Sequence, residues 1–146
     1  MHIYAYCTQV GVVHKPPQTN FDKRYQKLRY FFDPIFCLRI LDNACQVIVL
    51  IGESTKHLYK YVRWELQVVL DLELPLIAVN LDNRRSMNTD LCPPLIRDKY
   101  IAHIPFKLAI IKYALDNFPN EFKNRDKTKN GPRTYSGDVY KKLGLD

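Results

Sequence analysis

Two short apolar runs on either side of an amphipathic stretch constrain the fold of this chain most strongly. The first, "QVIVLIG", occupies residues 46–52, and the second, "LPLIAVNL", occupies residues 74–81. Continuous apolar runs of this length predict strands that are buried on both faces, as in a parallel sheet. Between them, residues 59–72 repeat apolar side chains at helical spacing, which predicts a helix packed on the sheet. Strand, helix and strand in succession indicate a βαβ unit.

The same pattern extends in both directions along the chain. Residues 2–7 predict a first strand, residues 100–105 a further strand, and residues 106–117 a helix after it. Two more helices are expected between residues 20 and 44, separated at Pro34. We therefore expect an α/β fold in which helices cover both faces of a parallel sheet. In such sheets ligands bind at the carboxyl ends of the strands.

Length and composition exclude several classes of protein. The chain has 146 residues, of which 47% are hydrophobic and 25% charged, as in a globular domain with its own core. No run approaches the roughly 18 apolar residues of a membrane span, and no basic-then-apolar leader is present, so we expect a cytoplasmic protein. The four cysteines form no CxxC pair and the four histidines are scattered, which predicts reduced thiols and no metal site.

The net charge of +7 is concentrated toward one end of the chain. From Lys123 onward there are seven basic residues against three acidic ones. This change in composition predicts an α/β domain over residues 1–122 and a basic polar tail over residues 123–146. Nucleic-acid binding is not favoured, because no recognised binding motif accompanies the charge.

Glu65 fits the predicted helix least well. It shares one helical row with Val68 and Leu72 and so lies within the apolar arc. A buried carboxylate costs free energy unless it is paired or needed. Three explanations are open from spacing alone: an ion pair with Arg63 or Lys60, a helix that turns this edge to solvent, or a carboxylate aimed into a cleft.

Small and polar residues follow the two predicted central strands. Gly52, Ser54 and Thr55 come directly after the first, and Asn80 lies near the end of the second. Because the carboxyl ends of parallel strands meet at one edge, these residues are expected at the mouth of a site. No GxGxxG, P-loop or GxSxG motif surrounds them, which disfavours a nucleotide-binding loop of those types and a serine hydrolase.

The stretch "VIVLIGESTKHLYKYVRWELQVVLDLELPLIAVNLD", residues 47–82, resembles the TIR-like domains of the Thoeris anti-phage defence system, of the ThsB type. That pattern has a strand ending in IG, a serine–threonine loop, a helix with a glutamate, and a strand similar to "PIIAVNL". The matching residues are Ile51, Gly52, Ser54, Thr55, Val62, Trp64, Glu65 and the run from Pro75 to Leu81. The resemblance covers roughly residues 36–122.

The resemblance implies a flavodoxin-like, TIR-like fold and cleavage of the nicotinamide–ribose bond of NAD. In many members of this family the cleavage forms a cyclic or conjugated ADP-ribose signal, which implies a separate signal-responsive effector protein. NAD is then the substrate, no further cofactor is required, and a homo-oligomer is expected. By the same resemblance Glu65 is the catalytic residue. The expected NAD-binding residues are Tyr6, Gly52, Ser54, Thr55, Trp64 and Asn80, with Tyr6 added from the predicted first strand.

The N-terminal part departs from the family pattern. Between Cys7 and Val47 no second strand is indicated, which leaves open a sheet that lacks one N-terminal strand. A site completed by a partner chain and an inactive member also stay open. Two other functions are therefore kept: a non-catalytic TIR-type assembly module, and a nucleoside deoxyribosyltransferase-like enzyme, which also places a glutamate at a ribose C1′.

Overall fold

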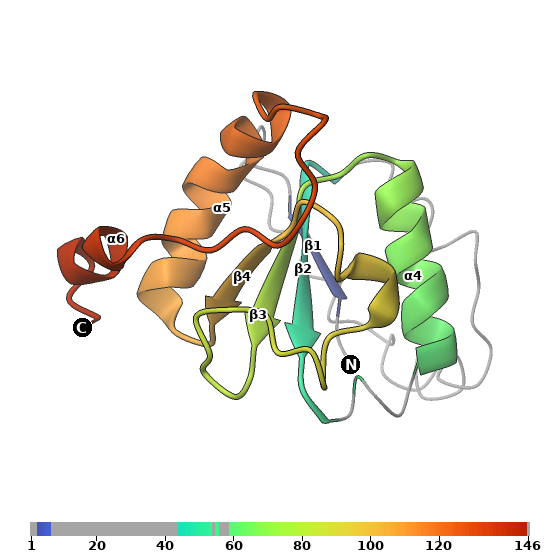
Figure 1. Cartoon of the computed structure of the whole chain (residues 1–146), viewed down its shortest axis with the longest axis horizontal. Coiled ribbons are helices and arrows are strands. Elements are labelled where there is room, and N and C mark those ends of the chain that lie inside the picture. Colours follow the sequence, from blue (N-terminus) through green and yellow to red (C-terminus); the bar gives the residue numbers. More distant parts are fainter. Residues whose placement is uncertain (1–2, 7–43, 54, 56–58, 146) are drawn as a thin grey trace, which may run out of the picture.

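The computed structural model describes residues 3–6, 44–53, 55 and 59–145, and it describes residues 3–6 and 59–62 by their backbone. Figure 1 shows helices on both sides of a twisted sheet. In chain order the elements are β1 (Ile3–Tyr6), β2 (Gln46–Ile51), α4 (Tyr59–Asp71), β3 (Leu76–Asn80), the 3-10 helix η1 (Pro94–Ile96), β4 (Ala102–Pro105), α5 (Leu108–Lys123) and α6 (Gly137–Lys142). All four predicted strands are therefore present. The two helices expected between residues 20 and 44 lie outside the described residues.

The strands are arranged in the order β1-β2-β3-β4. β2 and β3 pair in parallel, with Val47 opposite Leu76, and β3 pairs in parallel with β4. β1 runs antiparallel to β2, so that Tyr6 lies opposite Gln46, the first residue of β2. The expected α/β fold with a parallel sheet is confirmed for β2, β3 and β4. The antiparallel direction of β1 was not predicted from the sequence. Side chains alternate between the two faces of a strand in the same way whichever direction the strand runs.

The side chains of the central strands alternate between two apolar layers. Val47, Val49 and Ile51 of β2 are buried together with residues of α4 and η1, whereas Ile48 and Leu50 pack with residues of α5 and α6. Figure 1 shows α4 on one side of the sheet and α5 on the other. A strand with buried side chains on both faces needs apolar residues at successive positions, which explains the continuous run in the sequence. The expectation of helices on both faces is confirmed.

α4 packs on the sheet through Leu66 and Val69, which are both completely buried. Burial of each such side chain contributes roughly 1.5–3 kcal/mol to folding. The helix ends after Asp71, and the chain turns at Glu73, whose positive φ of 49° lies in the left-handed region. β3 then starts beside the amino end of β2. α4 therefore runs back along β2 and begins at the carboxyl ends of the parallel strands (Figure 1).

α5 is longer than the predicted helix at 106–117, because it continues through Pro119. Proline has no N–H to donate, so the carbonyl of Leu115, four residues earlier, loses its helical donor. The side-chain amide of Gln46 on β2 donates to that carbonyl at 3.0 Å. Phe118 and Phe122, on either side of the proline, pack near the ring of Tyr100. Together these contacts allow the helix to continue for another turn.

Replacing Gln46 by leucine is expected to lower the free energy of unfolding by about 1–3 kcal/mol, because the Leu115 carbonyl is left without its donor. In a Pro119→Ala background residue 119 regains an N–H, and the same Gln46 replacement is expected to cost less. Urea denaturation of the four proteins measures the coupling between the two positions. Equal losses in both backgrounds would show that Gln46 does not compensate for the proline.

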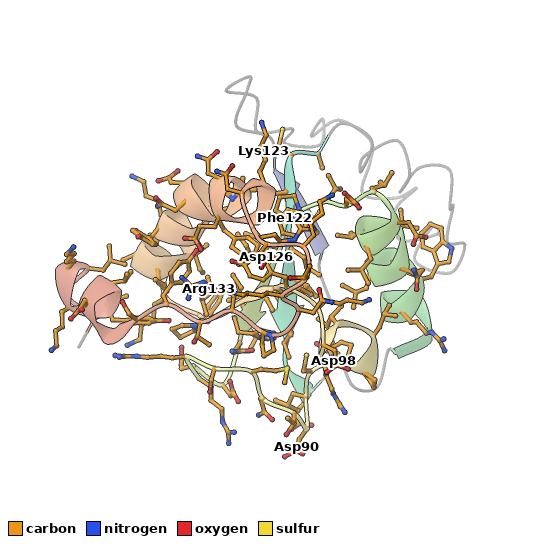
Figure 2. The ribbon with its side chains drawn as sticks, turned by 45° about the horizontal axis from the view of Figure 1, so that its top comes forward. Asp90, Asp98, Phe122, Lys123, Asp126 and Arg133 are labelled. Carbon is orange, nitrogen blue, oxygen red and sulfur yellow. The ribbon has the colours of Figure 1, made fainter. Side chains whose placement is uncertain are left out.

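The segment after α5, which composition sets apart as a basic tail, packs on the free edge of β4 at Arg133 (Figure 2). Arg133 donates its backbone N–H to the Ile101 carbonyl at 2.8 Å, and its carbonyl accepts the His103 N–H at 2.8 Å. Beyond this bridge, Tyr135 and Tyr140 are buried in the same apolar layer as α5. The lysines of α6, by contrast, are exposed. This segment therefore combines buried aromatic anchors with a charged surface.

The described helices include none that combines the length and the apolar character needed to cross a membrane.

Candidate active site at the carboxyl ends of β2 and β3

A tight turn built by Thr55 closes the carboxyl end of β2. The Thr55 hydroxyl donates to the Leu50 carbonyl at 3.0 Å and accepts the Gly52 N–H at 3.1 Å. The backbone N–H of Thr55 donates to the Gly52 carbonyl at 3.0 Å. Thr55 is almost completely buried. Its hydroxyl therefore fixes the direction in which the chain leaves the sheet.

Gly52 lies where the ends of β2 and β3 come together. The N–H of Leu81 donates to the carbonyl of Ile51 at 2.9 Å. A Cβ atom on residue 52 would lie 2.9 Å from Cδ1 of Leu81, closer than carbon atoms normally approach. The small residue thus lets the Leu81 side chain lean across the end of β2.

Asn80, the last residue of β3, organises the loop that follows. Its side-chain amide donates to the carbonyls of Arg84 at 2.9 Å and Ser86 at 3.0 Å. Its backbone carbonyl accepts the N–H groups of Asn83 and Phe106, each at 3.1 Å. Its Oδ1 atom is buried and has no hydrogen-bond partner in the structure. Asn80 therefore ties the loop after β3 to the start of the segment after β4.

Replacing Asn80 by alanine is expected to lower the free energy of unfolding by about 1–3 kcal/mol, because two loop carbonyls lose their donors. Amide hydrogen exchange over residues 82–88 should become faster. Asn120→Ala, at an exposed position of α5, is the control and should change stability by no more than about 0.5 kcal/mol. Unchanged exchange in the loop of the Asn80 variant would contradict this role.

Further along this loop, Asp82 accepts a network of hydrogen bonds. Its Oδ2 accepts the Asn88 amide at 2.8 Å and lies 3.3 Å from Nε of Arg84. Partial burial opposes ionisation, but the hydrogen bonds from Asn88 and from the Arg84 backbone lower the pKa of the Asp82 carboxyl. Asn88 in turn accepts the N–H of Asp90 at 3.0 Å. The sequence analysis did not identify these residues, and their only signal was the density of Asp and Asn typical of turns.

Glu65 lies beside the buried stripe of α4. Leu66 and Val69 are completely buried, and Glu65 is partly buried next to them. Burial raises the pKa of the Glu65 carboxyl. Arg63 is exposed, and no ion pair joins the described side chains of Arg63 and Glu65. An ion pair with Arg63 therefore does not explain the position of Glu65. The side chain of Lys60 lies outside the described residues.

The distance of Glu65 from the carboxyl edge follows from helix geometry. It is the seventh residue of α4, and a helix rises 1.5 Å per residue, so it lies about 9 Å along the axis from Tyr59. α4 begins at the edge where β2 and β3 end (Figure 1). A partly desolvated carboxylate in this place can attract a cation or a developing positive charge.

The structure brings together some of the predicted binding residues and separates others. Gly52, Thr55 and Asn80 lie at the carboxyl ends of β2 and β3, as predicted from the strand ends. Tyr6 lies opposite Gln46, at the amino end of β2, because β1 is antiparallel. The prediction that Tyr6 lies with Gly52 and Asn80 is therefore wrong. Trp64 is partly buried on α4, next to Glu65. Ser54 lies outside the described residues.

His103 is the one histidine of the described residues inside the core. It lies on β4 opposite Ala78 and is completely buried. Neither ring nitrogen has a hydrogen-bond partner in the structure. Burial alone lowers the pKa of this imidazole to about 4, so the ring is neutral at physiological pH. His103 belongs to the strand predicted over residues 100–105, and all four residues of β4 are buried.

Comparison with known proteins adds a family to this geometry. A search of curated proteins found no match. The family model described as Thoeris protein ThsB, TIR-like domain, matches residues 36–86. This range contains β2, α4 and β3, and with them Gly52, Glu65 and Asn80. The three parallel strands β2, β3 and β4 with helices on both faces are consistent with the α/β, flavodoxin-like arrangement of a TIR-like fold. Over residues 36–86 the chain is similar to the TIR-like domain of the Thoeris protein ThsB, which confirms the resemblance that its motifs indicated.

Proposed function

We propose that this protein is a TIR-like enzyme that cleaves the nicotinamide–ribose bond of NAD and makes an ADP-ribose-derived signal in anti-phage defence. One observation carries the proposal: within the matched segment, Glu65 is a partly buried carboxylate whose pKa is raised by burial. It lies on a helix that begins at the carboxyl edge of the sheet. A carboxylate that costs stability where it lies suggests a functional role.

The chemistry of the bond explains why a single carboxylate is enough. The bond between C1′ of the ribose and the nicotinamide nitrogen breaks, and its electron pair remains on the nitrogen. Nicotinamide is cationic in NAD and leaves as a neutral molecule, so no acid is required to protonate it. Positive charge develops on the ribose as the bond lengthens, and a preorganised carboxylate stabilises that charge. Glu65 supplies this group and accepts a hydrogen bond from a ribose hydroxyl.

The second half of the reaction determines the product. When water attacks C1′ and loses a proton, the product is ADP-ribose. When a nucleophile of the same substrate molecule attacks, the product is a cyclic form, and the displaced proton again goes to solvent. Either product can serve as a signal for a separate effector protein. We infer that the enzyme works as a homo-oligomer, with NAD as substrate and no additional cofactor.

The proposal is tested by incubating the purified full chain with NAD, with and without extract from phage-infected cells as a source of activator. Chromatography should show nicotinamide and an equal amount of an ADP-ribose derivative. The absence of nicotinamide under every condition, together with stable self-association, would instead support a non-catalytic assembly module. Exchange of bases on deoxynucleosides, with NAD left intact, would support the deoxyribosyltransferase-like alternative.

A further inference from the structure

Three exposed apolar side chains follow directly after β3 and β4, and we call them the carboxyl-edge row. They are Leu81, Phe106 and Leu108, which are 41%, 55% and 83% exposed. None belongs to either of the two apolar layers that the described residues form. The fold therefore gains little from their apolar character. Grouped exposed apolar residues of this kind are typical of interaction sites.

The carboxyl-edge row borders the candidate active site through backbone hydrogen bonds and a close side-chain approach. Leu81 donates its N–H to the Ile51 carbonyl and leans across Gly52. Phe106 donates its N–H to the Asn80 carbonyl at 3.1 Å. Both Leu81 and Phe106 thus adjoin Asn80. Leu81 follows β3 directly, and Phe106 follows the neighbouring strand β4. The row belongs to the same edge of the sheet as Gly52 and Asn80.

Positive charge accompanies the row. Lys107 lies between Phe106 and Leu108 and is exposed, and Arg84 and Arg85 follow Leu81 in the loop after β3. The guanidinium of Arg85 lies 4.2 Å from the ring centre of Tyr140 in α6 and donates to the Leu145 carbonyl, so α6 and the residues after it hold the guanidinium in place. Asp82 is the one carboxylate among residues 81–86 and 105–108, and it pairs with Arg84. An apolar surface beside an excess of cations is complementary to a flat base that carries phosphate groups.

We propose that the carboxyl-edge row binds the adenine of the dinucleotide, with Phe106 stacked on the base and Lys107 and the loop arginines beside the diphosphate. The inference rests on the proposed function, which places the ribose–nicotinamide end at Glu65. It assigns part of the opposite end of the substrate to residues outside the segment that matches the family model, namely Phe106, Lys107 and Leu108, since that match ends at residue 86. Phe106 is then a specificity-determining residue that does not take part in bond cleavage.

The test measures binding of ADP, which lacks nicotinamide, to the full-length protein by calorimetry. Phe106→Ala is expected to weaken binding about tenfold or more, as loss of one base–aromatic stack does. Phe106→Tyr keeps the ring and should bind within about twofold of wild type. Leu72→Ala removes an apolar side chain just after α4 that is 38% exposed, and should leave ADP binding unchanged. Nicotinamide mononucleotide, which lacks adenine, should bind equally well to wild type and Phe106→Ala.

Two results would overturn the inference: no binding of ADP to wild type at millimolar concentration, or equal affinity for wild type and Phe106→Ala. Sedimentation equilibrium of the same proteins identifies the competing occupant. If Phe106→Ala dissociates an oligomer without changing ADP affinity, the row is an interface with a second copy of this chain, and the adenine assignment is wrong. If ADP binds as expected but NAD is never cleaved, the proposed function fails while the nucleotide site stands.

Discussion

Replacing Glu65 by glutamine is expected to lower the rate of nicotinamide release from NAD by about 100- to 1000-fold, the usual cost of losing one preorganised electrostatic group. Glutamine has nearly the same size and can still accept a hydrogen bond from a ribose hydroxyl. It has no negative charge with which to stabilise the oxocarbenium-like ribose. Initial rates at saturating NAD should show the loss in kcat, with a smaller change in KM.

The same variant is expected to be at least as stable as wild type. Burial raises the pKa of Glu65, so the folded state disfavours the charged form. The cost of ionising this group in the folded protein is therefore present above the raised pKa and disappears as pH falls below the ordinary value. Glutamine removes the charge, and thermal unfolding at pH 7 should show an unchanged or higher midpoint.

Glu73→Gln is the matched control. Glu73 lies just beyond the same helix, its side chain is largely exposed, and it pairs with Lys127 at 3.6 Å. An exposed pair of this kind contributes little to stability. This variant should release nicotinamide at the wild-type rate. A Glu65→Gln protein that is clearly destabilised would indicate that the carboxylate has a structural role.

Acidification is expected to destabilise the protein through His103. Its pKa is about 4 in the folded state and near 6.5 in the unfolded chain, so the unfolded state takes up the proton first. The stability associated with the neutral ring is complete above pH 6.5 and is lost as pH falls toward 4. A difference of this size corresponds to about 3 kcal/mol in total, and to about 2 kcal/mol at pH 5. Urea denaturation at pH 7.5 and pH 5 measures the difference.

Replacing His103 by leucine isolates this contribution from the other groups that titrate. Because neither ring nitrogen has a hydrogen-bond partner in the structure, no such bond is lost with the imidazole. The variant should lose about 2 kcal/mol less than wild type between pH 7.5 and pH 5. If both proteins lose the same free energy, His103 is not the group responsible for acid sensitivity.

Local patterns were sufficient to predict the central fold. β2, α4 and β3 follow from continuous apolar runs and helical periodicity, because both reflect burial against a sheet. Two features depended on partners distant in sequence. Pro119 predicts the end of a helix, but Gln46, from β2, supplies the missing donor. The burial of Tyr135 and Tyr140 was likewise not predicted, because the composition of their segment is polar and basic.

Prediction of the site also succeeded where local patterns were sufficient and failed where the outcome depended on residues distant in sequence. Gly52 and Asn80 were predicted together because the ends of neighbouring parallel strands must meet. Tyr6 was grouped with them incorrectly, because nothing in a four-residue strand specifies its direction. Phe106 was assigned to the start of the last predicted helix, whereas α5 begins at Leu108 and leaves Phe106 exposed beside Asn80. Exposure of an apolar residue depends on the packed structure and has no local signal.

The most direct test of the central claim is a single-turnover experiment followed by proton NMR. Wild type and Glu65→Gln are first shown to have matching circular dichroism spectra. Each protein is then placed in excess over NAD in the presence of infected-cell extract. Extract without added protein is the background control. With wild type, the resonances of the nicotinamide ring in intact NAD should be replaced by those of free nicotinamide. Glu65→Gln should show no more conversion of NAD than the extract alone. Equal conversion of NAD by the two proteins would contradict the assignment of Glu65 as the catalytic residue.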